Sequence, residues 1–307
     1  MSAVAPGDGS PKVRVALDAM GGDSAPAAAV AGALMASADG VDVVLVGDEA
    51  RLTPLLDSAG VRLPVVHAAE AVDMGEEPAL ALRSKRDTSI RRAAALVASG
   101  EAAALVSAGS TGATLAAALL EIGRQTGVRR PAIGADLPGG VVLVDAGGSS
   151  EVQPEALFGY ARMGSAYARA RGVDSPSVGL LNVGAEPGRG SAMARAAFAL
   201  LSDLDSFAGN VEPDAVLAGK VDVVVTDGFT GNIFIKALEA AAGPAVGPSA
   251  AVLLGCSRPV LIAHGAAGPQ QVAAALATAR DVATAGLVER LGAELAATER
   301  VGEPAGG

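Results

Sequence analysis

The sequence predicts an α/β protein with three layers (α/β/α), in which helices cover both faces of a mainly parallel sheet. Short apolar runs such as 221–225 (VDVVV) alternate with longer helical patterns along nearly the whole chain, which is the order expected of βαβ units. These runs carry apolar residues at successive positions, as strands buried on both faces do. Glycine and small polar residues follow several of the runs, where open α/β sheets bind ligands.

Strands and helices can be assigned in turn along the chain. We expect strands at 13–17, 41–46, 63–67, 103–106, 141–144, 178–181, 221–225 and 260–263. We expect helices from about 26 to 38, at 50–58, 88–99, 111–124, 154–170 and 193–201, from about 230, and at 270–295. Pro26 suits a helix start, and Thr88 or Ser89 can cap one. The pattern indicates a single domain at 13–297 between a disordered tail at 1–12 and a frayed tail at 298–307.

Composition excludes several classes of protein. Half of the residues are hydrophobic but only 2% are aromatic, so the core must consist of Ala, Val and Leu. The net charge of -10 argues against general binding of nucleic acid or of an anionic membrane. No apolar stretch approaches the ~20 residues of a membrane span, and residues 1–12 lack the apolar centre of a signal peptide. We therefore expect a cytoplasmic protein that does not bind nucleic acid.

Two elements of similar design predict an anion site. In 221–236 (VDVVVTDGFTGNIFIK) and in 104–120 (ALVSAGSTGATLAAALL), an apolar strand runs through a small-polar loop into a helix. Such a loop presents unpaired backbone N–H groups to an anion. Taken alone, each loop is equally well explained as a tight turn that caps its helix. Together they predict a site for a phosphate-like group that is shared between two strand ends.

Other polar residues have a functional and a structural interpretation. The five basic residues of 83–92 are either a solvated helix face or a positive patch for phosphate or an acidic partner. Four aspartates follow strands and either cap loops or bind ligands; these are Asp18, Asp23, Asp145 and Asp227. No Glu or His accompanies them in a pattern that predicts a metal site. Cys256, the only cysteine, excludes an internal disulfide and follows an apolar run, so we expect it to be a small buried hydrophobe.

The two histidines differ in their surroundings. His264 follows an apolar strand and precedes a glycine, which suits a proton donor or a phosphate contact. His67 has an ordinary strand context and is expected to be structural.

The motifs are similar, in their order and over nearly the whole ordered chain, to those of the bacterial phosphate acyltransferases of phospholipid synthesis, the PlsX family. The matching stretches are ALDAMGGD (16–23), DMGEEP and RSKRDTSI (73–90), VSAGSTGA (106–113), ARMGSAYA (161–168), FAGNVE (207–212), VVVTDGFTGN (223–232) and VLIAHG (260–265).

The resemblance implies a homodimer with a fold like that of isocitrate dehydrogenases and phosphotransacetylases. It also implies an acyltransferase reaction that needs no cofactor and no metal, in which the acyl group of an acyl carrier protein thioester moves to inorganic phosphate. The product is an acyl phosphate for phospholipid synthesis. The expected catalytic residues are Lys85, His264 and Asp227, with His264 or Lys85 protonating the departing thiolate. The expected substrate and phosphate contacts are Asp18, Gly21, Gly22, Asp23, Ser84, Arg86, Ser107, Ser110, Thr111, Gly112, Asp145, Gly228, Thr230, Gly231 and Asn232.

The chain departs from the family pattern at several places. Ser110 and Ser149 stand where the family usually has Asn, and only 243–250 fills the place of a long helical hairpin. In the family that hairpin is linked to dimer packing and membrane contact, so its absence puts membrane association in doubt. Two alternatives therefore remain open. One is a diverged paralogue that uses another thioester, such as a short-chain acyl-CoA, and the other is a non-catalytic relative that binds an acyl group or phosphate.

Overall fold

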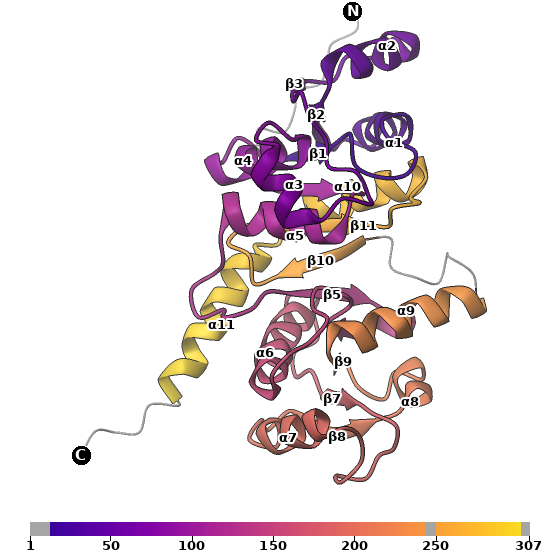
Figure 1. The fold of residues 1–307 in the computed structure, drawn as a ribbon. Helices are drawn as coiled ribbons and strands as arrows, with labels where there is room; N and C mark the ends of the chain where they lie inside the picture. The colour runs from indigo at the N-terminus through magenta and orange to yellow at the C-terminus, as the bar shows by residue number, and fades with distance from the viewer. Residues whose placement is uncertain (1–12, 243–249, 302–307) are drawn as a thin grey trace, which may run out of the picture.

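The computed structural model describes residues 13–242 and 250–301, and all described strands belong to one eleven-stranded sheet (Figure 1). The order across the sheet is β3-β2-β1-β4-β11-β10-β5-β6-β9-β7-β8. The strands are β1 (Arg14–Asp18), β2 (Asp42–Gly47), β3 (Val65–His67), β4 (Ala104–Ser107), β5 (Ala132–Asp136), β6 (Val142–Val144), β7 (Val178–Leu181), β8 (Phe207–Val211), β9 (Val223–Val225), β10 (Ala250–Leu254) and β11 (Val260–Ala263).

The helices are α1 (Ala27–Ala38), α2 (Glu49–Ala59), α3 (Pro78–Ser84), α4 (Ser89–Ser99), α5 (Thr111–Ala117), α6 (Pro154–Ala170), α7 (Ala192–Leu201), α8 (Pro213–Leu217), α9 (Gly228–Ala242), α10 (Pro269–Thr284) and α11 (Leu287–Val301). Most helices follow the predicted alternation with the strands, but α3 and α8 were not predicted, and no α-helix separates β5 from β6 or β10 from β11 in the described chain. Local chemistry sets many of their ends. Thr88 caps α4 by accepting a hydrogen bond from the Arg91 N–H, and Gly100 ends the helix in the left-handed conformation, as glycine readily does.

The sheet contains two parallel sets of strands that run in opposite directions. The pairs β11–β10, β10–β5 and β5–β6 are antiparallel, while the pairs on either side of these three are parallel. Three reversals place the carboxyl ends of the two parallel sets at opposite edges of the sheet. The predicted α/β/α class with a mainly parallel sheet is confirmed. Three strands, β5, β8 and β10, were not predicted, and β5 and β10 are the strands that produce the reversal.

The two faces of the sheet are covered differently. On the continuous face, one apolar core joins both halves of the sheet to α1, α2, α6, α7, α10 and α11. On the divided face there are two smaller cores, one under α4 and α5 and one under α8 and α9. Ala146 and Ala251 pack against both of these smaller cores. The divided face is therefore interrupted above the central strands.

Several predicted boundaries were wrong. The single helix expected at 270–295 is two helices, because Gly286 adopts a φ of +62° between them. The turn frees α11 to leave the α1 side of the sheet and pack against α6 in the other half (Figure 1). The helix expected at 111–124 ends at Ala117 and continues as a π-helical turn at Ala118–Ile122. Further, α9 begins at Gly228, and α11 continues to Val301, past the boundary predicted at 298.

Other expectations concern the tails, the missing hairpin and the membrane. The tail at 1–12, residues 302–307 and most of the stretch that stands for the hairpin lie outside the described residues. Within 13–242 and 250–301, no helix combines the length and apolar character needed to cross a bilayer.

Candidate functional site

A cleft opens on the divided face, above the central strands β11, β10, β5 and β6. It has a volume of about 220 Å³. Its floor consists of the apolar residues Ile133, Ala135, Ala146, Ile235, Ala251, Ile262 and Ala263, and its rim consists of Thr111, Gly147, Asn232, Lys236, Glu239 and His264. In Figure 1, α5 and α9 lie on either side of β10 and carry the two walls. The cleft thus combines an apolar floor with a polar rim, as ligand sites commonly do.

The first predicted anion loop, between β4 and α5, reaches this cleft through Thr111. Ser107 is fully buried; its hydroxyl donates to Asp18 Oδ2 at 2.8 Å and accepts from the Gly109 N–H at 3.0 Å. Ser110 caps α5 by accepting from the Ala113 N–H at 3.5 Å. The loop is therefore held from below by hydrogen bonds, and Thr111 at the first position of α5 lines the cleft.

The second predicted anion loop forms the opposite wall. Asp227 stands just before α9 and accepts from the Thr230 N–H at 2.9 Å and from its hydroxyl at 2.7 Å, as a capping residue does. Asn232 and Lys236, one helical turn apart, line the cleft. Because their parent strands run in opposite directions, the two loops leave opposite edges of the sheet. They approach each other across a face of the sheet, where Thr111 and Asn232 line the same cleft.

Two glycines of the second loop allow α9 to pack closely on the loop that follows β6. A Cβ on Gly231 would lie 2.0 Å from the Asp145 carbonyl oxygen, and one on Gly228 would lie 2.4 Å from the Ser149 carbonyl oxygen. These positions require glycine because any larger residue would push α9 away. They set the position of the wall and leave the ligand contacts to Asn232 and Lys236.

Asp145 organises the loop on which α9 packs. It is fully buried, and its Oδ1 accepts from the N–H groups of Ile133 at 3.0 Å and Gly148 at 2.8 Å. Its Oδ2 accepts from the Ser149 hydroxyl at 2.7 Å. These bonds occupy the carboxylate, so Asp145 supports the cleft from beneath.

His264 lies at the end of β11 with an exposed side chain on the rim of the cleft. Its Nδ1 accepts from the Ala266 N–H at 3.1 Å. This bond assigns the proton of the neutral ring to Nε2. The imidazole can therefore offer an N–H to a group in the cleft.

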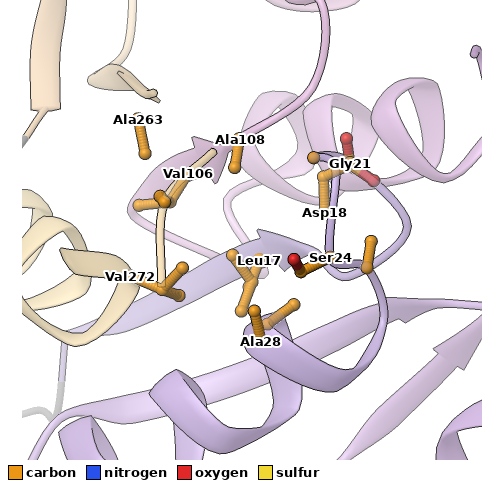
Figure 2. Close-up of a pocket in the computed structure, with 13 residues that line it drawn as sticks. Leu17, Asp18, Gly21, Ser24, Ala28, Val106, Ala108, Ala263 and Val272 are labelled. Atoms are coloured by element: carbon orange, nitrogen blue, oxygen red, sulfur yellow. The ribbon is translucent and has the colours of Figure 1, made fainter. Parts of the chain in front are cut away.

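The loop that carries Asp18 packs beside the cleft and does not line it. Burial raises the pKa of the Asp18 carboxyl above its ordinary value, against the hydrogen bonds it accepts from Ser107 and the Met20 N–H. Figure 2 shows the cavity next to this carboxyl, with Leu17 among its apolar walls. Its volume of about 10 Å³ leaves room for no more than about one water molecule. A Cβ on Gly21 would lie 2.7 Å from Asp18 Oδ2, so this glycine serves close packing.

Gly22, Asp23 and Gly112 also join neighbouring segments. Gly22 adopts a φ of +105° against Ala108, and the Asp23 N–H donates to the Gly265 carbonyl at 2.8 Å. A Cβ on Gly112 would lie 2.7 Å from the Pro78 ring. These contacts tie the 22–23 segment to Ala108 and Gly265, and α5 to α3.

Lys85 is engaged outside the cleft. Its ammonium donates to Glu76 Oε1 at 2.8 Å, to Glu76 Oε2 at 2.7 Å and to the Ala71 carbonyl at 2.9 Å. These three bonds use its three N–H donors. The Lys85 ammonium also holds the pKa of Glu76 below its ordinary value. In this arrangement Lys85 fastens the 71–77 segment and is not directed at a substrate.

The rest of the basic run is partly paired. Arg91 pairs with Glu121 and Arg92 with Asp87, while Arg83 and Arg86 are exposed and make no ion pair with a described residue. Ser84 is exposed and donates its hydroxyl to the Leu80 carbonyl at 2.9 Å. The run is thus mostly a structural network on α3 and α4, with two arginines left to face solvent.

Of the residues predicted from sequence, the structure brings Thr111, Asn232 and His264 together in the cleft. Sequence reasoning missed Lys236 and Glu239 as rim residues. A signal for Lys236 existed, because it lies four positions after Asn232 and shares its helix face. Cys256 is buried, and burial raises its pKa to about 12, which confirms the expected small buried hydrophobe. The part of the chain that the structure describes contains no group of three or more His, Cys, Asp or Glu side chains placed to hold a metal ion.

Comparisons with known proteins agree on one family. A family model described as "Fatty acid synthesis protein" matches residues 13–246. A phosphate acyltransferase of Thermus thermophilus is 47% identical over 232 residues, which cover 74% of this chain and 71% of that protein. A phosphate acyltransferase of Bacillus cereus is 44% identical over 238 residues, which cover 75% of this chain and 72% of that protein.

Solved structures share the fold at much lower identity. A phosphotransacetylase from Streptococcus pyogenes aligns with a TM-score of 0.68 and 17% identity over 91% of this chain and 94% of its own. A branched-chain phosphotransacylase from Enterococcus faecalis aligns with a TM-score of 0.62 and 18% identity over 88% of this chain and 99% of its own. At such identities the likeness concerns the fold alone.

Proposed function

This chain belongs to the phosphate acyltransferase (PlsX) family, and we propose that it moves a fatty acyl group from an acyl carrier protein thioester to inorganic phosphate. A phosphate oxygen attacks the thioester carbonyl carbon, the C–S bond breaks, and the departing thiolate takes up a proton. The products are an acyl phosphate, which feeds phospholipid synthesis, and the free carrier thiol. Phosphate is already an anion at neutral pH, so the enzyme has to hold and aim it.

One observation carries this proposal. The cleft brings the polar donors Thr111, Asn232, Lys236 and His264 together above an apolar floor. Lys236 offers a positive charge, and the Thr111 hydroxyl and the Asn232 amide offer N–H or O–H donors. Such groups stabilise phosphate and the negative charge that develops on the thioester oxygen. The floor of Ala135 and Ala251 suits the first carbons of an acyl chain.

His264 is the proposed proton donor to the thiolate. It is the histidine on the rim, and its Nε2–H is available because Nδ1 is engaged by the Ala266 N–H. Lys85, the other predicted donor, would first have to break its contacts with Glu76 and Ala71. We therefore assign Lys85 a positioning role and Asp227 the role of holding the start of α9.

The proposed protein partners follow from the family. We propose acyl carrier protein as the acyl donor, a homodimer as the assembly and the cytoplasm as the location. Phe229 and Ile233, which are 61% and 50% exposed on adjacent turns of α9, offer an apolar surface for a second subunit. Light scattering should give twice the chain mass of 29.8 kDa, and a monomer at micromolar concentration would contradict the dimer.

A second candidate is a phosphate acyltransferase that uses short-chain acyl-CoA. The size of the cleft favours it, because about 220 Å³ is below the roughly 300–1,000 Å³ of typical small-molecule pockets. A small acyl group needs less of that space than a long chain does.

The deciding experiment measures phosphate-dependent release of free thiol by purified protein from long-chain acyl carrier protein and, in parallel, from short- and long-chain acyl-CoA. Release from carrier protein that requires phosphate and yields acyl phosphate is the expected result. Activity only with short acyl-CoA would select the second candidate. No release from any donor, by folded protein that still binds phosphate, would reject catalysis in favour of a binding relative.

A further inference from the structure

A second and larger hollow lies on the continuous face, on the side of the sheet opposite the cleft. We call it the α6–α11 groove. It measures about 560 Å³ and lies between α6, α11 and the 127–130 segment that leads into β5. Val128, Phe158, Met163 and Leu295 give it an apolar lining. Its volume is within the range of small-molecule sites, roughly 300–1,000 Å³, and the proposed reaction makes no use of it.

Hydrogen bonds hold the segments that border the groove in place. Arg162 of α6 donates through Nη2 to the Leu295 carbonyl, and Gln125 donates through Nε2 to the Val288 carbonyl. These two bonds fasten α11, at residues about two helical turns apart, to α6 and to the segment that precedes 127–130. A Cβ on Gly159 of α6, which lines the groove, would meet no atom within 4 Å. The space is therefore held open by anchored elements.

The mouth of the groove is positively charged, although the chain carries a net charge of -10. Arg129 and Arg130 line it with exposed side chains, and neither forms an ion pair with a described residue. Arg124 donates to the Arg129 carbonyl at 2.7 Å and so fixes the segment that carries both arginines. Glu155 is the acidic residue among the described lining. α6 begins beside them without a side-chain cap, so its dipole adds to the positive potential.

We propose that the α6–α11 groove binds an anionic amphiphile, a molecule with an apolar chain and a carboxylate or phosphate head. The apolar lining gains free energy by covering the chain, and the two arginines form charge-assisted hydrogen bonds with the head group. Inorganic phosphate would leave the apolar lining uncovered, and a neutral lipid would leave the arginines unused. This inference does not depend on the reaction proposed for the cleft.

Binding can be followed with a single fluorophore, because the chain contains no tryptophan. Phe158→Trp places the only indole in the groove. We expect a saturable change of its emission with decyl phosphate or decanoate, and the head group that binds more tightly identifies the source of the ligand. Inorganic phosphate, decanol and decyltrimethylammonium should produce no saturable change.

Two variants in the Phe158→Trp background test the chemistry. Arg129→Glu combined with Arg130→Glu should weaken binding by at least about tenfold, while Arg51→Glu on the distant helix α2 should not. Gly159→Leu should fill the groove and abolish binding, with circular dichroism confirming the fold. Equal binding of decanol, or unchanged binding in the arginine and Gly159 variants, would overturn the proposal. An emission change that depends on protein concentration without any probe would also overturn it, because a second copy would then cover the groove.

Discussion

The two histidines show how similar residues acquire different roles. His67 is the last residue of β3 and His264 directly follows β11, and each accepts a backbone N–H through Nδ1, from Glu49 at 3.3 Å and from Ala266 at 3.1 Å. Only His264 lies on the rim of the cleft. Its position, and not its local hydrogen bonding, is what qualifies it as a proton donor.

This comparison supplies a matched pair of substitutions. His264→Ala should lower kcat for thiol release about 100-fold, because general acid catalysis contributes roughly 10²–10⁴-fold. His67→Ala should leave kcat close to that of the unaltered enzyme. Steady-state kinetics with saturating phosphate measures both values. Full turnover by His264→Ala would remove this residue from the mechanism.

The stabilisation that the folded protein gains from the ion pair between Lys85 and Glu76 should decrease at acidic pH. The Lys85 ammonium holds the pKa of Glu76 below its ordinary value of 4.5. A carboxyl group with a lowered pKa in the folded state adds stability above its ordinary pKa and loses this contribution as the pH falls through the folded value. The attachment of the 71–77 segment should therefore weaken below pH 4.5.

Glu76→Gln should reduce this part of the acid sensitivity, since the amide does not titrate. The measurement is the free energy of unfolding in urea at pH values from about 3 to about 7, a range that spans the ordinary pKa values of carboxyl groups. Glu151→Gln, at an exposed glutamate, serves as the control. An acid dependence that is the same in Glu76→Gln and in the unaltered protein would contradict the assignment.

At the scale of elements, the start of α9 decides the geometry of the cleft. Asp227 holds its first turn, and the two glycines bring it against the loop organised by Asp145. Asn232 and Lys236 then face the cleft because they lie one turn apart on the same side of the helix. The position of the α9 wall of the cleft therefore depends on this contact between α9 and the 145–149 loop.

Gly231→Ala tests that contact. The added Cβ would lie 2.0 Å from the Asp145 carbonyl oxygen, so α9 has to shift. We expect a loss of about 1–3 kcal/mol in the free energy of unfolding and a higher KM for phosphate. Gly188→Ala, where a Cβ would meet no atom within 4 Å, should change neither quantity. Stability and KM equal to those of the unaltered enzyme would show that α9 does not set the site.

At the scale of the whole molecule, the apolar core of the continuous face joins the two halves of the sheet, which have separate cores on the divided face. One apolar core extends from α1 and α10 in one half of the sheet to α6 and α7 in the other. α11 follows α10, packs against α6 and contributes the buried residues Leu287, Leu291 and Leu295 to this core. The two halves therefore share their main core and should unfold together.

We expect one cooperative thermal transition in scanning calorimetry, with coincident loss of far-ultraviolet circular dichroism. Leu291→Ala should lower the free energy of unfolding by about 2–5 kcal/mol, as burial of leucine in a core predicts, and should keep the transition single. Two separate transitions, in the unaltered protein or in this variant, would show that the halves are independent units.

Local sequence patterns were sufficient for most of the elements. The bounds predicted for α6, β7 and β11 match the structure, because apolar runs and helical periodicity depend only on neighbouring residues. Of the missed strands, β5 (AIGAD) includes Ala and Gly, and β10 (AAVLL) begins with two alanines; these residues favour strands weakly. Both segments become strands through pairing with β11 and β6 on either side.

The candidate site was predicted only in part for the same reason. Thr111, Asn232 and His264 belong to recognisable loops, so the sequence pointed to them. The engagement of Lys85 by Glu76 and the position of Lys236 on the rim depend on where whole segments lie. The bond from Ser107 to Asp18, which joins residues 89 positions apart, likewise has no local signal.

By itself, the sequence determined the α/β class, the alternation of its elements, the family and the two loops around which the site is built. The tertiary structure decided that the two parallel sets of strands run in opposite directions, so that these loops meet across a face of the sheet. It also decided that this face is divided and the other is continuous. The physical reason is that caps and periodicity are properties of adjacent residues, whereas strand direction, charge pairing and cavities arise from contacts between distant ones.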